Sequence, residues 1–223
     1  MLEFSAILLT LRLALATTII LLIIGTPLAW WLATTKSRAK PIVEAATAMP
    51  LVLPPTVLGF YMLILFNPDS LLGGFWVNAT GDTLAFSFTG LVIASVVYSL
   101  PFMVQPLQSA FETMGKTYME AAASLRASPL DAFLTVAAPL SLRGFITASI
   151  LTFAHTVGEF GVVLMVGGNI PGQTRVISIA IYENVETLNY AQAHFLSVIL
   201  LAFSFFVLFF VYSTNRQSRV HVG

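Results

Sequence analysis

The sequence contains no cysteine, which excludes disulfide bonds, thiolate metal sites and cysteine nucleophiles. Its three histidines lie far apart and are not spaced as metal ligands, so we predict no metal site. Only 9% of the 223 residues are charged, whereas soluble globular domains have about a quarter. Lys plus Arg equals Asp plus Glu at 10 each, which leaves no basic excess for binding a nucleic acid. Together these absences predict an integral membrane protein.

The sequence is instead rich in hydrophobic residues, which make up 57% of the chain and gather into long runs. A helix needs about 20 apolar residues to cross the hydrocarbon core of a bilayer. Five runs of this kind predict an all-α protein with about five transmembrane helices. They cover residues 13–35, 45–67, 83–110, 144–168 and 193–214. The first run extends back to Phe4 if Arg12 is tolerated, and a short helix within residues 73–78 or 184–190 would alter the number of spans.

The basic residues predict the orientation of these helices. Eight of the ten follow the first run, separate the third from the fourth, or follow the fifth: Lys36, Arg38, Lys40, Lys116, Arg126, Arg143, Arg216 and Arg219. The loops on the opposite side contain only Arg175. Because cytoplasmic loops carry an excess of Lys and Arg, we predict the N-terminus outside and the C-terminus in the cytoplasm.

Prolines interrupt several of the runs. They are Pro27, Pro50, Pro54, Pro55, Pro101 and Pro106. Each removes a backbone hydrogen bond, which lipid tolerates only where protein or water satisfies the freed carbonyl group. Helices broken in this way commonly line solute pathways, although any single proline could equally be a packing kink. The density of prolines in residues 50–55 favours a pathway.

Glu159 is the one acidic residue inside the predicted fourth run. A carboxylate in a span is costly, so it is expected to have a partner or a function. We expect a hydrogen bond at the helix end near Gly158 or Gly161, or an ion pair with Arg175 or with a base on a second subunit. His155 would share this network or simply pack.

Hydroxyl groups in the runs could donate hydrogen bonds to a passing anion, or bond their own helix backbone. They belong to Thr56, Ser95, Ser99, Thr152 and Thr156.

Residues 111–143 form the only sizeable predicted cytoplasmic segment. Its alanine-rich part, from Glu120, favours a short helix. Ser128 and Pro129 are typical of an N-cap and a first helical position, so we predict a second helix through Val136 that Pro139 ends. Two short helices joined by a turn make a compact projection suited to a groove on a partner. An ordinary amphipathic loop is the alternative.

Residues 110–117 match a relaxed ATP-binding pattern, with Ala110 in place of the first glycine. A phosphate-binding loop needs a preceding β-strand and a surrounding α/β domain, whereas this match follows a predicted membrane span. We therefore expect the chain not to hydrolyse ATP.

The segment 111–143 resembles the EAA motif of the importer permeases of the ABC transporter superfamily. The matching positions are Glu120, Ala121, Ala122, Arg126, Val136 and Pro139. The resemblance implies that these residues couple the chain to a separate ATPase. The family usually has Leu at Ala138 and Gly at Arg126. Because Gly supplies a positive φ that costs other residues about 1 kcal/mol, we expect a turn of different shape here.

Further stretches resemble the branch of these permeases that carries tetrahedral oxyanions. They are residues 50–59, 99–104, 153–161 and 169–175, although the branch more often has Arg at His155. Nearly the whole chain is similar to molybdate permeases, and a sulfate or tungstate permease is the alternative. A conduit for a dianion should offer hydrogen-bond donors but no buried Lys or Arg, which would trap the anion. The second and third runs fit this requirement, because they contain neither Lys nor Arg.

The resemblance implies a type I importer permease of the bacterial inner membrane, with residues 1–223 as a single transmembrane domain and residues 111–143 as its ATPase-docking loop. It implies a homodimer, two ATP-binding subunits and a periplasmic substrate-binding protein. It implies no cofactor on this chain, since the partner ATPase would use ATP and Mg. The predicted pathway or gate consists of Pro54, Pro55, Thr56, Ser99, Pro101, Thr156 and Glu159.

A stand-alone channel or secondary transporter is the alternative from another class. A secondary transporter would need a coupling-ion site, for which Glu159 is the only candidate, and it would usually show an inverted repeat, which the sequence lacks.

Overall fold

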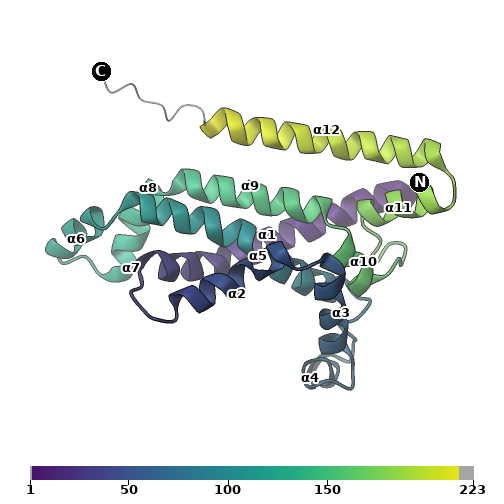
Figure 1. Cartoon of the computed structure of the whole chain (residues 1–223), viewed down its shortest axis with the longest axis horizontal. Helices are drawn as coiled ribbons and strands as arrows, with labels where there is room; N and C mark the ends of the chain where they lie inside the picture. Colours follow the sequence, from purple (N-terminus) through teal and green to yellow (C-terminus); the bar gives the residue numbers. More distant parts are fainter. Residues whose placement is uncertain (1, 216–223) are drawn as a thin grey trace.

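The computed structural model describes residues 2–215, and this part of the chain is helical with no β-strand. The all-α prediction is therefore confirmed. The helices are α1 (Leu2–Thr34), α2 (Lys40–Val52), α3 (Pro55–Phe66), α4 (Leu71–Thr80), α5 (Phe88–Met114), α6 (Thr117–Ser124), α7 (Pro129–Ala132), α8 (Ala138–Leu140), α9 (Leu142–Gly158), α10 (Gly161–Gly167), α11 (Ile177–Glu186) and α12 (Tyr190–Asn215). A π-helical turn, Phe133–Ala137, joins α7 to α8. The molecule is elongated, with α6 and α7 at one end and α11 at the other (Figure 1).

Three of the helices in the described part are long and apolar enough to cross a membrane, namely α1, α5 and α12. Two bent pairs raise the number to five if each pair is one span. In one pair α2 and α3 meet at 111°, and in the other Pro129–Leu140 and α9 meet at 74°. The predicted fourth run is divided, because α9 ends at Gly158 and α10 begins at Gly161.

Adjacent prolines cause the sharpest bend. Leu53 has ψ 135° and Pro54 has ψ 135°, so both residues leave the helical region. Each of them precedes a proline, whose ring disfavours the α conformation in the residue before it. Single prolines act differently, because α1 continues through Pro27 and α5 through Pro101. Pro27 and Pro101 therefore leave their helices unbroken.

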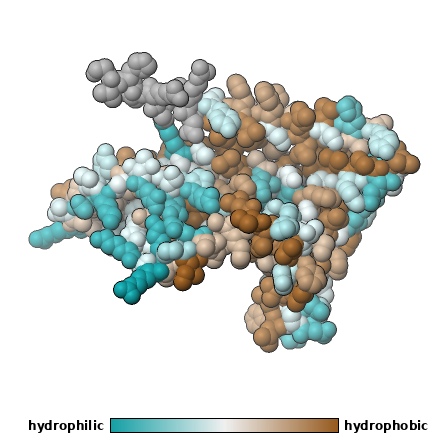
Figure 2. All heavy atoms as spheres, viewed as in Figure 1, coloured by the Kyte–Doolittle hydropathy of each residue, from teal (hydrophilic) through white to brown (hydrophobic). Residues whose placement is uncertain are grey.

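Helices α1, α5 and α9 form the centre of the molecule. Their buried contact includes Leu21 and Leu32 of α1, Met103 and Leu107 of α5, and Ala148 of α9. Of the apolar stretch of α5, 56% is buried, whereas only 11% of that of α12 is buried. Figure 1 shows α12 lying apart along one side, and Figure 2 shows it covered with hydrophobic side chains. Helix α12 therefore presents most of its surface to lipid or to a partner.

Pro139 does not end the second helix of residues 111–143, contrary to the prediction. The helix runs on to Leu140, through the π-helical turn. A proline ring clashes with the carbonyl group four residues earlier, here that of Thr135. The π-helical turn widens the helix at this point, and the N–H group of Ala138 bonds to the carbonyl oxygen of Phe133, five residues back.

The two short helices considered from the sequence have different outcomes. Residues 73–78 lie within α4, whose N-cap Ser70 accepts a hydrogen bond from the N–H group of Gly73. Residues 184–190 do not form a helix of their own, because α11 ends at Glu186 and α12 begins at Tyr190.

Candidate functional site

Two places where the chain leaves the helix lie against each other. One is the bend between α2 and α3, and the other separates α9 from α10. An added Cβ atom at Gly161 would lie 2.7 Å from the Cβ atom of Pro55, and one at Gly59 would lie 2.6 Å from that of Met165. Only glycine lets the backbones approach this closely. We call residues 53–55 and 158–161 the paired break.

Glu159 ties the paired break to two other helices. Its side chain is 3% exposed, and its Oε2 atom accepts a hydrogen bond of 2.8 Å from Ser95 Oγ on α5. Its backbone oxygen accepts a hydrogen bond from Ser178 on α11. Within the described residues, its Oε1 atom has no hydrogen-bond partner. The expected partner at the helix end is thus the hydroxyl group of Ser95, and not a backbone group at Gly158 or Gly161.

Of the alternatives for Glu159, the ion pair with Arg175 is wrong, because Arg175 is held by Glu183. Its Nη1 atom lies 3.0 Å from Glu183 Oε2, and its Nη2 atom donates to Oε1 at 3.2 Å. Its Nε atom donates to Asn169 Oδ1 at 2.6 Å. A bidentate pair of this kind fixes geometry as well as charge. Arg175 therefore fastens the loop after α10 to α11, and this pairing could not be chosen from sequence spacing.

A row of buried polar side chains continues from Glu159 between α5 and α9. Ser99 Oγ lies 2.9 Å from His155 Nδ1 and 3.0 Å from Thr156 Oγ1. Thr156 in turn donates to the carbonyl oxygen of Thr152 at 3.0 Å. The His155 ring stacks on Phe102, with ring centroids 3.9 Å apart. We call this row the polar seam (Ser95, Ser99, Thr152, His155, Thr156 and Glu159).

The structure divides the predicted pathway residues into two groups. Ser99, Thr156 and Glu159 meet in the polar seam, where they are buried between helices of the same chain. Pro54 and Thr56 are exposed beside the paired break, and Pro55 is partly exposed there. Pro101 is buried inside α5. Among the predicted pathway residues, only those of the proline-rich bend therefore offer surface to a solute.

The residues of the predicted docking loop occupy the end of the molecule formed by α6, α7 and α8. Hydrophilic residues gather at this end in Figure 2. Glu120, in the first turn of α6, also borders a cavity of about 460 Å³ between α6 and the ends of α1 and α5. Of the six positions that match the EAA motif, Val136 is partly buried and Ala122 is buried. The four exposed positions are Glu120, Ala121, Arg126 and Pro139.

The turn at Arg126 keeps the shape that glycine normally supplies, so the expectation of a different turn is wrong. Arg126 has φ 62°. Its N–H group bonds to the carbonyl oxygen of Ala123, and the N–H group of Ala127 bonds to that of Ala122. This pair of bonds is the Schellman motif, which places the residue after the helix end in the left-handed region.

We expect Arg126→Gly to raise the free energy of unfolding by about 1 kcal/mol, because glycine adopts a left-handed conformation without steric cost. Thermal unfolding of the purified protein in detergent measures this. Ala127→Gly is the control, since Ala127 has no positive φ and its replacement should destabilise the chain. Equal changes of the same sign in the free energy of unfolding of both variants would contradict the left-handed conformation of Arg126.

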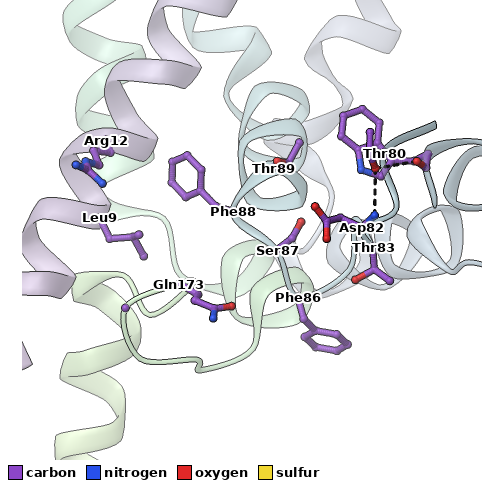
Figure 3. Close-up of a pocket in the computed structure, with 12 residues that line it drawn as sticks. Leu9, Arg12, Thr80, Asp82, Thr83, Phe86, Ser87, Phe88, Thr89 and Gln173 are labelled. Carbon is purple, nitrogen blue, oxygen red and sulfur yellow. Dashed lines mark hydrogen bonds between the residues drawn. The ribbon is translucent and has the colours of Figure 1, made fainter. Parts of the chain in front are cut away.

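Sequence reasoning missed a cavity of about 650 Å³ at the end of the molecule opposite the docking loop. It lies between α1, α4, the start of α5 and the loop after α10. Figure 3 shows Arg12 projecting from α1 on one side and Asp82 on the other, with Phe88 and Gln173 between them. The charge of Arg12 inside an apolar run was the available indication.

Comparison with known proteins adds to this geometry. The profile of the family described as "Binding-protein-dependent transport system inner membrane component" matches residues 25–219. The molybdenum transport system permease protein ModB of Azotobacter vinelandii is 56% identical over 96% of this chain and 95% of its own. The ModB protein of Escherichia coli K12 is 35% identical over 83% of this chain and 81% of its own.

Among solved structures, an inward-facing form of the MetNI methionine ABC transporter has a similar fold. The TM-score is 0.74 at 17% identity, over 97% of this chain and 95% of that one. At this identity the likeness concerns the fold alone.

Proposed function

The chain belongs to the family of binding-protein-dependent transport system inner membrane components, and from this premise we propose that it conducts molybdate into the cell as the membrane-spanning subunit of an ABC importer. The observation that carries the proposal is its 56% identity to a molybdenum permease over 96% of the chain. As in these relatives, the chain is a transport subunit and not an enzyme. ATP and Mg are used by a separate ATPase, and this chain binds no cofactor.

The proposed assembly contains two copies of this chain, two ATP-binding subunits and a periplasmic substrate-binding protein. Each docking loop fits one ATP-binding subunit, because its matching residues lie mainly on the surface at one end of the molecule. The conduit lies between the two copies, where the exposed bend at Pro54 and Thr56 of each copy contributes surface. The binding protein supplies most of the affinity for the anion.

The orientation proposed for the chain places the docking loop in the cytoplasm. Basic residues support this, because Arg126 lies between α6 and α7, and Arg143 lies at the start of α9. Lys36, Arg38 and Lys40 lie where α1 gives way to α2. Arg216 and Arg219, which entered the same prediction, lie outside the described residues. The N-terminus and the cavity at Arg12 then face the outside.

Two helices carry movement of the docking loop to the paired break. Two residues separate the end of α5 from the start of α6, and one residue separates the end of α8 from the start of α9. Both helices reach the polar seam, where Ser95 of α5 holds Glu159 just beyond α9. Closure of the ATPase pair would move α5 and α9 together at the docking end. The paired break, where α2 gives way to α3 and α9 gives way to α10, is the point that can bend in response.

The test of this function is uptake of radiolabelled molybdate at trace concentration, in cells with and without this chain. We expect uptake to be lost without the chain and to be unaffected by excess sulfate. Uptake that sulfate abolishes would move the chain to the sulfate branch and keep the ABC assignment. No difference between the two cell types would contradict the oxyanion assignment itself.

Purification in mild detergent separates the importer from a stand-alone channel or secondary transporter. An importer subunit is expected to bring a soluble ATPase with it, and a channel is not.

A further inference from the structure

The cavity at the outer end of the molecule is built around a single cation. Arg12 lies in α1, which otherwise carries no charge between Phe4 and Thr34, and its side chain is exposed. Within the described residues no ion pair joins Arg12 to a carboxylate. A charge inside a span is costly, so it faces a water-filled cavity and marks an ion or substrate path more often than it faces lipid.

Three of the four hydroxyl groups that line this cavity already donate to a nearby backbone oxygen. Thr80 donates to the carbonyl oxygen of Trp76, Thr83 to that of Ala85, and Ser87 to that of Leu84. In the described part of the chain, the side chains of Arg12, Thr89 and Gln173 make no such bond and are available to a ligand. All three are donors, and an arginine offers five N–H groups in a fixed plane.

The available donors fit an oxyanion, and the opposite wall limits how strongly it is held. Leu9 and Phe88 make part of the wall apolar, which strengthens the field of Arg12 inside the cavity. Asp82, across the cavity in Figure 3, repels a dianion. One cation and one carboxylate leave the lining neutral, so an anion is attracted to one side without being trapped.

The cavity lies close to the polar seam. Thr89 borders the cavity and Ser95 belongs to the seam, and both are on α5. Six residues of an α-helix span about 9 Å. The loop that bears Asp82 is also fastened to α10, because the N–H group of Phe86 bonds to the carbonyl oxygen of Val166 at 2.9 Å. The cavity is therefore linked to the polar seam through α5 and to one side of the paired break through α10.

We propose that this cavity is a transient binding site for a tetrahedral oxyanion at the outer entrance of the conduit, with Arg12 as its charged contact. This site rests on the proposed function and gives Arg12 and the outer cavity a part in it. The anion released by the binding protein meets Arg12 and Gln173 first. It then moves toward the paired break, because the site is too weak to retain it.

The absence of cysteine from this chain allows a direct test of the charge. The purified complex of Arg12→Cys with its ATP-binding subunits is treated with a methanethiosulfonate that adds either a trimethylammonium or a sulfonate group. It is then reconstituted in proteoliposomes, and molybdate uptake is measured with saturating binding protein and ATP. We expect Arg12→Cys to lower the initial rate about tenfold, which corresponds to one lost contact of ordinary strength. The cationic adduct should restore most of the rate, and the anionic adduct should not.

Matched controls separate the possible causes. The complex with the unaltered chain is treated with both reagents, and because this chain has no cysteine, any response there comes from a partner protein and is subtracted. Asp69→Asn removes an exposed carboxylate that does not border the cavity, and it should leave uptake at the unaltered rate. Wild-type uptake by Arg12→Cys, or equal effects of the two adducts, would overturn the inference.

Binding of the substrate-binding protein to the complex is measured in parallel. If Arg12→Cys abolishes this binding, Arg12 contacts a carboxylate of that protein, and the site for the oxyanion is refuted. If the unaltered complex takes up no molybdate, the proposed function fails first, and that failure is visible before any variant is compared.

Discussion

Gly161→Ala is expected to abolish most molybdate uptake and to destabilise the protein. The added Cβ atom would lie 2.7 Å from the Cβ atom of Pro55, and a proline ring cannot turn aside as a flexible side chain can. Forcing such a contact apart costs about 1–3 kcal/mol. A change of about 1.4 kcal/mol in the balance of two conformations alters their ratio tenfold, so we expect uptake to fall at least about tenfold.

Gly158→Ala is the matched control for this variant. Gly158 lies in the same paired break, but an added Cβ atom there has no neighbour within 4 Å. Its replacement should leave uptake and thermal stability nearly unchanged. Uptake in proteoliposomes and thermal unfolding in detergent are measured for both variants. If Gly161→Ala transports like the unaltered chain, the contact between the two breaks has no part in transport.

Replacing Glu120 and Pro139 together with alanine is expected to uncouple transport from ATP hydrolysis. Both side chains are exposed, and surface changes of this kind usually alter stability by less than about 0.5 kcal/mol. The assembled permease should therefore stay intact, while uptake falls about tenfold or more because the docking loop no longer follows the ATPase. Uptake, ATP hydrolysis and size-exclusion chromatography of the same preparation distinguish these effects.

Asp131→Asn serves as the comparison for the docking loop. Asp131 is another exposed acidic residue of this loop, in the first turn of α7, and it is not among the positions that match the EAA motif. The Asp131→Asn variant should transport molybdate at the unaltered rate. A double variant at Glu120 and Pro139 that transports at the unaltered rate would show that the coupling assignment is wrong.

Local chemistry allowed much of the fold to be predicted from the sequence. Apolar runs located α1, α5 and α12, and the adjacent prolines 54 and 55 located the sharpest bend. Ser128 was predicted as an N-cap, and its hydroxyl oxygen accepts from the N–H group of Asp131 at 3.2 Å. Each of these features depends on residues within a few positions of one another, so the sequence order itself contains the information.

The features that were missed depend on contacts between distant parts of the chain. Ser95 and Glu159 are 64 residues apart, and nothing in their spacing selects this contact over the ion pair of Glu159 with Arg175. The conformation of Arg126 was also misjudged, because the hydrogen bonds of the Schellman motif hold the turn despite the missing glycine. Arg12 drew attention only as a charge to be tolerated, since the other walls of its cavity come from α4, α5 and the loop after α10.

The contrast between α5 and α12 has a consequence for how the chain enters the membrane during synthesis. The mean hydropathy of the apolar stretch is 1.6 in α5 and 2.7 in α12, so the more buried helix is the less hydrophobic one. Helix α12 is therefore apolar enough to leave the translocon for lipid by itself. Helix α5, with two prolines inside it, gains more from packing on α1 than from lipid. Insertion of α5 should thus require that α1 is still next to the translocon, so that α1 and α5 enter the bilayer as a pair.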